Sequence, residues 1–460
     1  MTSLTEPAPI AQLRTDLEGR VIGPEDPDYA QARTVFYGGM DHRPAAIVQP
    51  ADAAQVAQVI SAARDSGLEL AVRSGGHSVA GHGLTDGGIV LDLGAMRGLE
   101  IDHEARTAWA QTGLTAGEYT NAVGEHGLAT GFGDTGSVGI GGITLGGGVG
   151  YLSRAYGLTI DDLLAAELVT ADGQILQVDE ESHPDLFWAI RGGGGNFGVA
   201  TRFKFRLHEL PTVVGGMLLL PATADVLSSL IAAAEDASDQ LSAIANVMPA
   251  PPMPMVPAEH HGRLVVMALI CFAGSPDEGE RALAPFRSIA QPVADLLRPM
   301  PYPEIYPPDP EGFHPTAAAR NLFVDSVDHA VAERVIERVS SSDAPMRVAQ
   351  FRVLGGAISR VPGDATAYAH RNSRIMTNVA AFYTGPEDRL VREAWVDEFA
   401  AELRQSDAGA YVNFVGDEGA ERVRAAYPGA TWDRLAEIKA RYDPTNLFRR
   451  NQNIPPAAAP

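Results

Sequence analysis

The stretch Arg73-Ser-Gly-Gly-His77-Ser78 decides how this chain is interpreted. It lies within residues 71–93 (AVRSGGHSVAGHGLTDGGIVLDL), where one apolar run enters a glycine-rich turn and a second run leaves it. Glycines let a backbone turn tightly and bring its N–H groups close to a phosphate. The turn therefore predicts a phosphate-bearing ligand with His77 beside it. A histidine that is merely solvated in a loop is the plain alternative.

Two further glycine-rich segments follow along the chain. Residues 136–150 read GSVGIGGITLGGGVG, and residues 191–198 read RGGGGNFG. Glycine this dense weakens regular elements, so either a backbone that touches a large ligand or tight turns between buried strands would explain it. No GxxxxGK[ST] phosphate loop occurs, and a GxGxxG spacing such as the one at residues 193–198 is weak evidence for a Rossmann fold without a clear βαβ unit around it.

The order of these motifs carries a family resemblance. RSGGHS, VGIGGITLGGGVGYLSRAYGLTIDDL, VTADG and DLFWAIRGGGGNFGV together resemble the covalent flavoproteins of the vanillyl-alcohol oxidase and p-cresol methylhydroxylase superfamily. The C-terminal YVNF and RLAEIKARYDPTNLFRRNQNI are similar to its berberine-bridge-enzyme-like branch, which includes bacterial D-nicotine oxidases and oligosaccharide oxidases. The resemblance covers about Pro44 to Ile454.

The resemblance implies an α+β fold, in which a two-part FAD-binding domain carries an inserted α/β substrate domain, an antiparallel sheet covered by helices. The expected parts are an N-terminal segment at 1–39, the FAD-binding domain at 40–211, the substrate-binding domain at 212–409 and a returning segment at 410–460. Apolar spacing predicts helices over 51–67, 224–234 and 386–405, and apolar runs predict strands at 70–73, 89–93, 203–207 and 264–272. A hairpin is predicted around Asp172, and a disordered tail after Pro455.

Composition limits the partners and the compartment. The 460 residues carry a formal net charge of −23, which disfavours nucleic acid and anionic membranes as partners. The one cysteine, Cys271, lies in an apolar run and cannot form an intrachain disulfide. No apolar stretch reaches membrane-helix length, and no signal peptide is recognisable, so we expect a cytoplasmic protein. The oligomeric state stays open, with a homodimer as one alternative.

The resemblance implies a covalent bond between His77 and the 8α-methyl group of FAD. Further cofactor contacts, mostly from the backbone, are expected at Arg73, Ser74, Gly75, Gly76, Ser78, Thr135, Val138, Gly139, Gly141, Gly142, Gly146, Gly147, Gly148, Asp161, Val199, Tyr411, Asn413 and Asn453. Thr135 occupies the position where some relatives carry a second, cysteine-linked bond. Threonine cannot form a thioether, so the expected attachment is through His77 only, and no metal is expected.

Tyr411, Tyr156 and Asn378 are the catalytic candidates. Tyr156 matches the tyrosine of the family's RKYGL motif, and Tyr411 matches the substrate-side tyrosine of its Y-x-N motif. A tyrosinate could accept the substrate proton if its pKa falls from about 10, whereas aromatic packing is the alternative for both residues. Asn378 stands near the point where plant relatives place a glutamate or glutamine, and it can orient a substrate but cannot act as a base.

Four other polar residues receive structural interpretations. We expect a solvated side chain at His82, and structural roles at His370 and Arg371. Asp161 is equally well explained as a holder of a loop or of the adenosine side and as a helix N-cap.

The leading functional hypothesis is a flavin oxidase that acts on a small alcohol, amine or phenolic natural product and passes electrons to oxygen, forming hydrogen peroxide. Proline-rich loops and apolar strands weakly favour such a substrate over a sugar. The alternatives are a dehydrogenase that uses another acceptor and a non-catalytic flavoprotein that sequesters a ligand.

Overall fold

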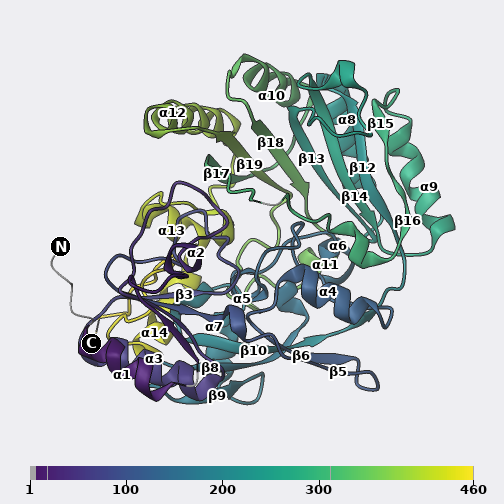
Figure 1. Ribbon diagram of the computed structural model, residues 1–460. Helices are drawn as coiled ribbons and strands as arrows, with labels where there is room; N and C mark the ends of the chain where they lie inside the picture. Colours follow the sequence, from purple (N-terminus) through teal and green to yellow (C-terminus); the bar gives the residue numbers. More distant parts are fainter. Residues whose placement is uncertain (1–6, 18, 311, 459–460) are drawn as a thin grey trace.

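Figure 1 shows a computed structural model of the chain, which describes residues 7–17, 19–310 and 312–458. The elements form two lobes. The lower lobe contains the purple and blue N-terminal elements together with the yellow C-terminal helices, and the upper lobe contains the teal and green elements between them. The chain therefore leaves the lower lobe once and returns to it at its end.

The first sheet of the lower lobe has four strands in the order β1-β2-β4-β3, of which only the β1–β2 pair is antiparallel. Its strands and neighbouring helices are β1 (Arg20–Ile22), β2 (Ala46–Gln49), β3 (Leu70–Arg73), β4 (Ile89–Asp92), α1 (Ala8–Asp16), α2 (Tyr29–Ala32) and α3 (Ala53–Ser66). The predicted helix over 51–67 is confirmed, because Asp52 caps the first turn of α3 and Gly67 ends it at φ 71°. Strand β1 lies within the predicted N-terminal segment, so that segment takes part in the sheet.

The second sheet of the lower lobe is antiparallel, in the order β5-β6-β10-β8-β9. These strands are β5 (Leu99–Asp102), β6 (Thr107–Gln111), β8 (Leu163–Val169), β9 (Ile175–Val178) and β10 (Val199–Arg206), with a two-stranded ribbon of β7 (Leu128–Ala129) and β11 (His208–Glu209) nearby. The predicted hairpin is confirmed as β8–β9. The helices of this part are α4 (Ala116–Gly124), α5 (Ile140–Leu145), α6 (Ser153–Tyr156), α7 (Pro184–Ile190), α13 (Ala420–Ala426) and α14 (Ala430–Tyr442).

The upper lobe is built on an eight-stranded antiparallel sheet in the order β15-β12-β14-β13-β18-β19-β17, with β16 paired to β12. Its strands are β12 (Val213–Pro221), β13 (Leu241–Pro249), β14 (Leu264–Phe272), β15 (Ala294–Asp295), β16 (Arg298–Met300), β17 (Ala317–Val324), β18 (Arg347–Val353) and β19 (Ile375–Phe382). Four longer helices, α8 (Ala224–Asp236), α9 (Pro276–Arg287), α10 (His329–Ser341) and α12 (Pro386–Leu403), share one hydrophobic core with the sheet. Short helix α11 (Ala357–Arg360) lies against α6 of the lower lobe. The opposite face of the sheet is left to meet the lower lobe.

Two expectations about irregular segments are corrected. The glycine-rich segment 136–150 contains helix α5, which the glycine content argued against. The tail after Pro455 is not disordered as far as it is described, because Ala457 N–H donates to the Ala436 carbonyl of α14. Among the described residues, no helix is both long and apolar enough to cross a membrane.

Candidate active site

His77 lies in the loop that follows β3, at the edge of the lower lobe. Its imidazole stacks on Phe36 with ring centres 4.0 Å apart, and its Nε2 lies 3.0 Å from Ser137 Oγ. Burial lowers the pKa of His77 to about 4, so the ring is neutral at pH 7. Among the described residues, no group bonds to Nδ1, which leaves this nitrogen available as a nucleophile.

The backbone around His77 presents a row of free donors. Within the described part of the chain, no group accepts from the N–H groups of Gly75, Gly76, His77 and Ser78. A Cβ atom on Gly75 would overlap the backbone nitrogen of Gly139, so the first two glycine-rich segments touch through their main chains. Unpaired amides in such a turn favour an anionic ligand, and the loop fits the diphosphate of FAD.

The side chains of Arg73 and Ser74 hold the loop in place. Arg73 pairs with Asp92 over 2.9 Å, and both side chains are at least nine-tenths buried. Ser74 Oγ donates to the Thr112 carbonyl over 2.6 Å and accepts from Gly141 N–H over 3.3 Å. Both residues are among the expected cofactor contacts, and these bonds leave the backbone as the main source of free donors in the loop.

The expectation of a solvated His82 is wrong. Its Nε2 is buried, and its backbone N–H donates to Ser78 Oγ over 3.2 Å. Burial and the charge of Arg450 lower the pKa of His82 to about 4. The loop folds under the C-terminal segment, because Arg450 donates to the Leu84 carbonyl.

The glycines of residues 139–148 serve two different contacts. A Cβ on Gly142 would meet nothing within 4 Å, so this position leaves room for a ligand. At Gly146 and Gly148 a Cβ would instead overlap the side chains of Asn413 and Thr159. Gly147 similarly lies against protein, with Tyr368 beside it. Glycine is thus required at residues 146–148 by close protein packing, and the flavin contact expected of their backbone stays a prediction.

Residues 134–138 form the loop that carries Thr135 and Val138. Asp134 pairs with Arg352 of β18 over 2.7 Å, which joins this loop to the upper lobe. The Val138 carbonyl accepts from Ala116 N–H over 2.8 Å. Thr135, partly buried, lies between the residue that pairs with Arg352 and the residue that contacts His77.

Tyr411 is fully enclosed next to the second glycine-rich segment. Its Oη accepts from Gly148 N–H over 3.0 Å and from Asn413 Nδ2 over 2.9 Å. Burial raises the pKa of Tyr411, although these two donors and the charge of Arg352 act in the opposite direction. The protein alone thus does not lower this pKa as proton abstraction requires, but it provides donors that would stabilise a phenolate.

The structure does not bring Tyr156 together with Tyr411. Tyr156 stacks face to face on His208, with ring centres 3.9 Å apart, and burial raises its pKa. His208 is in turn held by Asp162 over 2.8 Å. Tyr156 and Tyr411 belong to separate apolar clusters, which supports the packing interpretation for Tyr156.

A row of amide side chains crosses the upper sheet on the face toward the lower lobe. Cross-strand pairing aligns Asn246, Gln350, Asn378 and Asn321 on β13, β18, β19 and β17. Asn321 Oδ1 accepts from Tyr411 N–H over 2.7 Å, which places this end of the row beside Tyr411. Asn378 Oδ1 is buried without a hydrogen-bond partner among the described residues.

Arg352 stands next to this row, and the sequence analysis missed it. Its Nε donates to Gln350 Oε1 over 3.0 Å, and its guanidinium lies 5.1 Å from the centre of the Phe414 ring. Together with its bond to Asp134, these contacts make it the charged link between the sheet and the lower lobe. No local signal in the sequence FRVLGG marks this role, since all of its side-chain partners except Gln350 are distant in the chain.

Asp161 adopts a structural role within the protein. Its carboxylate receives two hydrogen bonds from Arg371, over 2.7 and 2.8 Å, and a third from Leu158 N–H over 2.7 Å. This agrees with the loop-holding alternative, whereas the N-cap of the short helix at residues 159–161 is Leu158 and not Asp161. His370 Nε2 lies 3.1 Å from the Ala426 carbonyl, which agrees with its expected structural role.

Residues from the C-terminal segment complete the lower lobe. Asn453 Oδ1 is buried without a partner among the described residues. Val199, another expected cofactor contact, lies outside this segment and pairs through its backbone with Val169 in the sheet. The buried Lys439 was not predicted, and it donates to Asp443 over 2.6 Å and to the Asn196 carbonyl over 2.7 Å. The third glycine-rich segment thus anchors the tail.

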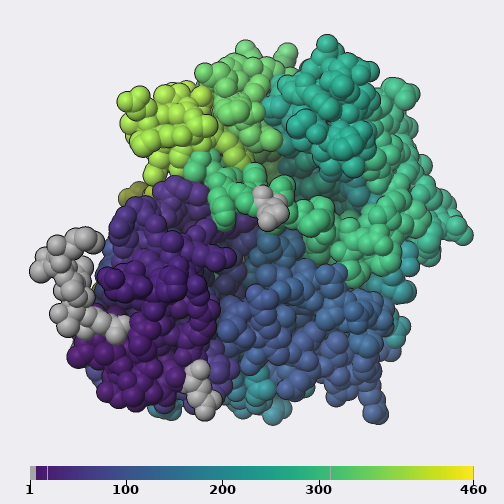
Figure 2. All heavy atoms as spheres, viewed as in Figure 1, coloured from purple at the N-terminus to yellow at the C-terminus, as the bar shows by residue number. Residues whose placement is uncertain are grey.

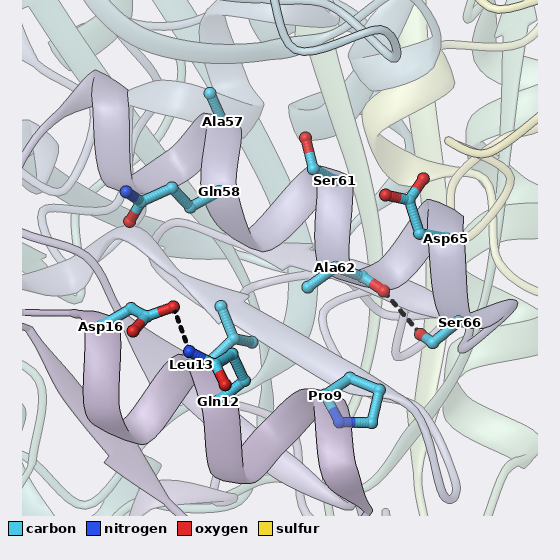
Figure 3. A pocket seen from close by; sticks show the side chains of 10 residues that line it. All are labelled: Pro9, Gln12, Leu13, Asp16, Ala57, Gln58, Ser61, Ala62, Asp65 and Ser66. Carbon is cyan, nitrogen blue, oxygen red and sulfur yellow. Dashed lines mark hydrogen bonds between the residues drawn. The ribbon is translucent and has the colours of Figure 1, made fainter.

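Two concave regions differ in their relation to these residues. Figure 2 shows a hollow at the centre of the viewed face, between the purple and blue parts of the lower lobe and the green part of the upper lobe. A separate groove of about 570 Å³ opens between α1 and α3 (Figure 3), with Leu13, Ala57 and Ala62 in its lining. Its lining contains none of the predicted site residues, so it lies apart from the site described here.

Family profiles match both ends of the lower lobe. A profile described as an FAD binding domain matches residues 44–179, and one described as berberine and berberine like matches residues 410–455.

Full-length relatives extend this match to the whole chain. An uncharacterized FAD-linked oxidoreductase, YvdP of Bacillus subtilis, is 32% identical, and the match covers 96% of this chain and 99% of the YvdP chain. The (R)-6-hydroxynicotine oxidase of Paenarthrobacter nicotinovorans is 30% identical, and the match covers 96% of this chain and 97% of that protein. The structure of xylooligosaccharide oxidase from Myceliophthora thermophila, in complex with xylobiose, has a TM-score of 0.85 at 25% identity. The match covers 98% of this chain and 100% of that structure's chain.

Proposed function

Because the chain belongs to the berberine-bridge-enzyme-like family of FAD-linked oxidoreductases, we propose that it is an oxidase that takes hydride from a C–H next to O or N of a small organic substrate and forms hydrogen peroxide from oxygen. Bound FAD supplies the hydride acceptor in this chemistry. The chain supplies the attachment, the substrate contacts and the group that receives the substrate proton.

The observation that carries the proposal is the surroundings of His77. The imidazole is neutral and Ser137 holds its Nε2, while neither Nδ1 nor the four neighbouring backbone amides have a partner within the described part of the chain. This arrangement supports attachment of FAD through His77, with its diphosphate at the amides. Thr135 has no thiol, which supports a single covalent link.

For the proton, we propose Tyr411 as the acceptor. Its Oη already receives two N–H donors, so a phenolate formed there would be stabilised without rearrangement. The remaining obstacle is burial, which raises its pKa. A cationic substrate beside the ring would offset this, and an amine substrate therefore suits the site better than an uncharged sugar.

The amide row on the upper sheet is proposed to orient the substrate. Asn378 Oδ1 has no partner among the residues that the structure describes, and Gln350 is held by Asn246 and Arg352. These groups favour a substrate with N–H or O–H groups. One relative is named for a hydroxynicotine and one for a xylooligosaccharide, so both chemistries belong in the substrate screen.

The attachment is tested with His77→Ala, using Phe36→Leu as a matched control that disturbs the stacked ring but keeps the imidazole. We expect the flavin of the wild type and the control to stay in the acid-precipitated protein pellet, and the flavin of His77→Ala to appear in the supernatant. Flavin that remains with precipitated His77→Ala would contradict the assignment.

The reaction is tested by mixing the purified protein without oxygen with amines, alcohols, phenols and oligosaccharides. A substrate should bleach the flavin absorbance, and admitting oxygen should restore it with one hydrogen peroxide per turnover. Bleaching without peroxide on reoxidation would identify a dehydrogenase instead, and the absence of bleaching by the tightest ligand would favour sequestration.

A further inference from the structure

A small cavity lined in part by Arg352 lies where the two lobes meet. Its volume is about 10 Å³, close to one water-sized probe. It lies among α6, α11 and the ends of β13 and β18, and Figure 1 shows α6 and α11 beside the lower edge of the upper sheet. Arg154, Ser242 and Arg352 are the polar side chains in its lining that carry unpartnered atoms.

Two of these lining residues are buried cations. The side chain of Arg352 is 6% exposed and is neutralised by Asp134. Arg154, itself only 5% exposed, donates to the carbonyls of Leu354 and Ala237, and no described carboxylate lies within ion-pair distance of it. A buried charge is normally paired, so Arg154 leaves an uncompensated positive charge at the cavity.

More distant carboxylates do not supply the missing charge. Asp239 and Glu235 act electrostatically on Arg154, but Asp239 is paired with Arg360 and Glu235 with Arg374. The excess positive charge therefore remains at the junction of the lobes.

Three hydrogen-bond donors in the lining also lack partners. Arg154 Nε, Arg352 Nη1 and Ser242 Oγ are buried, and none has an acceptor among the described residues. A guanidinium N–H cannot accept a hydrogen bond, so two of the three can only donate. A water molecule could accept from the two guanidinium N–H groups and donate to Ser242 Oγ, but it would leave the charge of Arg154 unpaired. A monatomic anion accepts from all three donors and also neutralises that charge.

We propose that this cavity, lined by Arg154, Arg352 and Ser242, binds a small monovalent anion such as chloride. The anion neutralises Arg154, satisfies the three donors and ties α6 of the lower lobe to β13 and β18 of the upper lobe. Because Arg352 also contacts Asp134 and Phe414, the anion would hold that guanidinium beside the candidate active site without touching the substrate.

The first test is thermal unfolding of the purified holoprotein at constant ionic strength, with chloride replaced stepwise by gluconate, which is too large for the cavity. We expect Tm to rise by about 2 °C when chloride reaches about 30 times its Kd. Bromide should act like chloride, and sulfate should not. An identical Tm in chloride and gluconate would overturn the proposal.

Variants separate this site from a general salt effect. Ser242→Ala removes one donor and should raise the dissociation constant for chloride about tenfold. Arg154→Met removes the unpaired charge and should abolish the chloride response. Arg281→Met, which removes an exposed arginine on α9, should respond as the wild type does. A chloride response that is unchanged in Ser242→Ala would place the ion elsewhere.

Diffraction from crystals grown in bromide provides an independent readout. An anomalous peak among Arg154, Ser242 and Arg352 is expected, and the peak should be lost in Ser242→Ala or Arg154→Met, whichever variant crystallises. Density without an anomalous signal would identify a water molecule and overturn the proposal.

Discussion

Asp161 offers the sharpest distinction between a cofactor ligand and a structural residue. The sequence places it among the candidate FAD contacts, whereas the structure pairs it with Arg371 through two hydrogen bonds of 2.7 and 2.8 Å. The two side chains are 9% and 1% exposed. Changing Asp161 to Asn therefore removes the charge that compensates a fully buried guanidinium.

The size of the effect follows from this burial. Breaking a buried pair by removing one partner costs about 3–5 kcal/mol, because the other charge is left unpaired. For a chain of 460 residues, the unfolding entropy near Tm is about 1 kcal/mol per kelvin, so Asp161→Asn should lower Tm by about 4 °C. The bound flavin and its absorbance spectrum should remain unchanged.

The assay is a thermal melt combined with the flavin content of each purified variant. Asp364→Asn, at an exposed loop position, is the control and should melt within about 0.5 °C of the wild type. In a double-mutant cycle, Arg371→Met should cost less in the Asp161→Asn background than alone. Loss of flavin from Asp161→Asn at an unchanged Tm would refute the structural assignment and restore Asp161 as a cofactor ligand.

Three other predictions concern catalysis, the tail and pH. Tyr411→Phe should slow anaerobic flavin bleaching by about 100-fold with the flavin retained, and an unchanged bleaching rate would remove it as the proton acceptor. Lys439→Met leaves the buried Asp443 without its cation, so Tm should fall by about 4 °C and the tail should become sensitive to trypsin; resistance of the tail would contradict its anchoring role. The folded pKa of His82, about 4, lies below its unfolded value, so the unfolded state binds one more proton between about pH 4 and 6.5 and stability rises with pH across that window. His82→Gln should reduce this slope, measured from melts at pH 4.5–6.5, by about one proton, and an unchanged slope would mean that His82 is protonated in the folded protein.

The elements that the sequence predicted well are those decided by local signals. Helix α3 buries Val56, Val59, Ile60 and Ala63, whose spacing of three and four residues is the apolar pattern that predicts a helix over 51–67. Strand β14 has the bounds Leu264–Phe272 that its apolar run indicated. In each case the period of the apolar residues, or the length of their run between breaks, is enough to specify the element.

The errors arise where distant contacts override local signals. His82 is polar and lies in a loop, but a C-terminal arginine more than 360 residues away closes over that loop. Helix α5 forms despite its two internal glycines, with Asn413 packed against the glycine that follows it. Arg352 meets Asp134 across 218 residues, and no spacing rule connects such positions.

The loop at residues 134–138 supports the proposal that FAD is attached through a single bond to His77. Asp134 ties one end of the loop to Arg352 of the upper lobe, and Ser137 brings the other end to within 3.0 Å of His77. Thr135 lies between these two contacts, at the position where the family resemblance allows a second bond. An ion pair with both partners at least four-fifths buried restrains the loop without a thioether. The same pair links the loop that contacts His77 to the upper sheet, so the proposed attachment site and the proposed substrate surface share one contact.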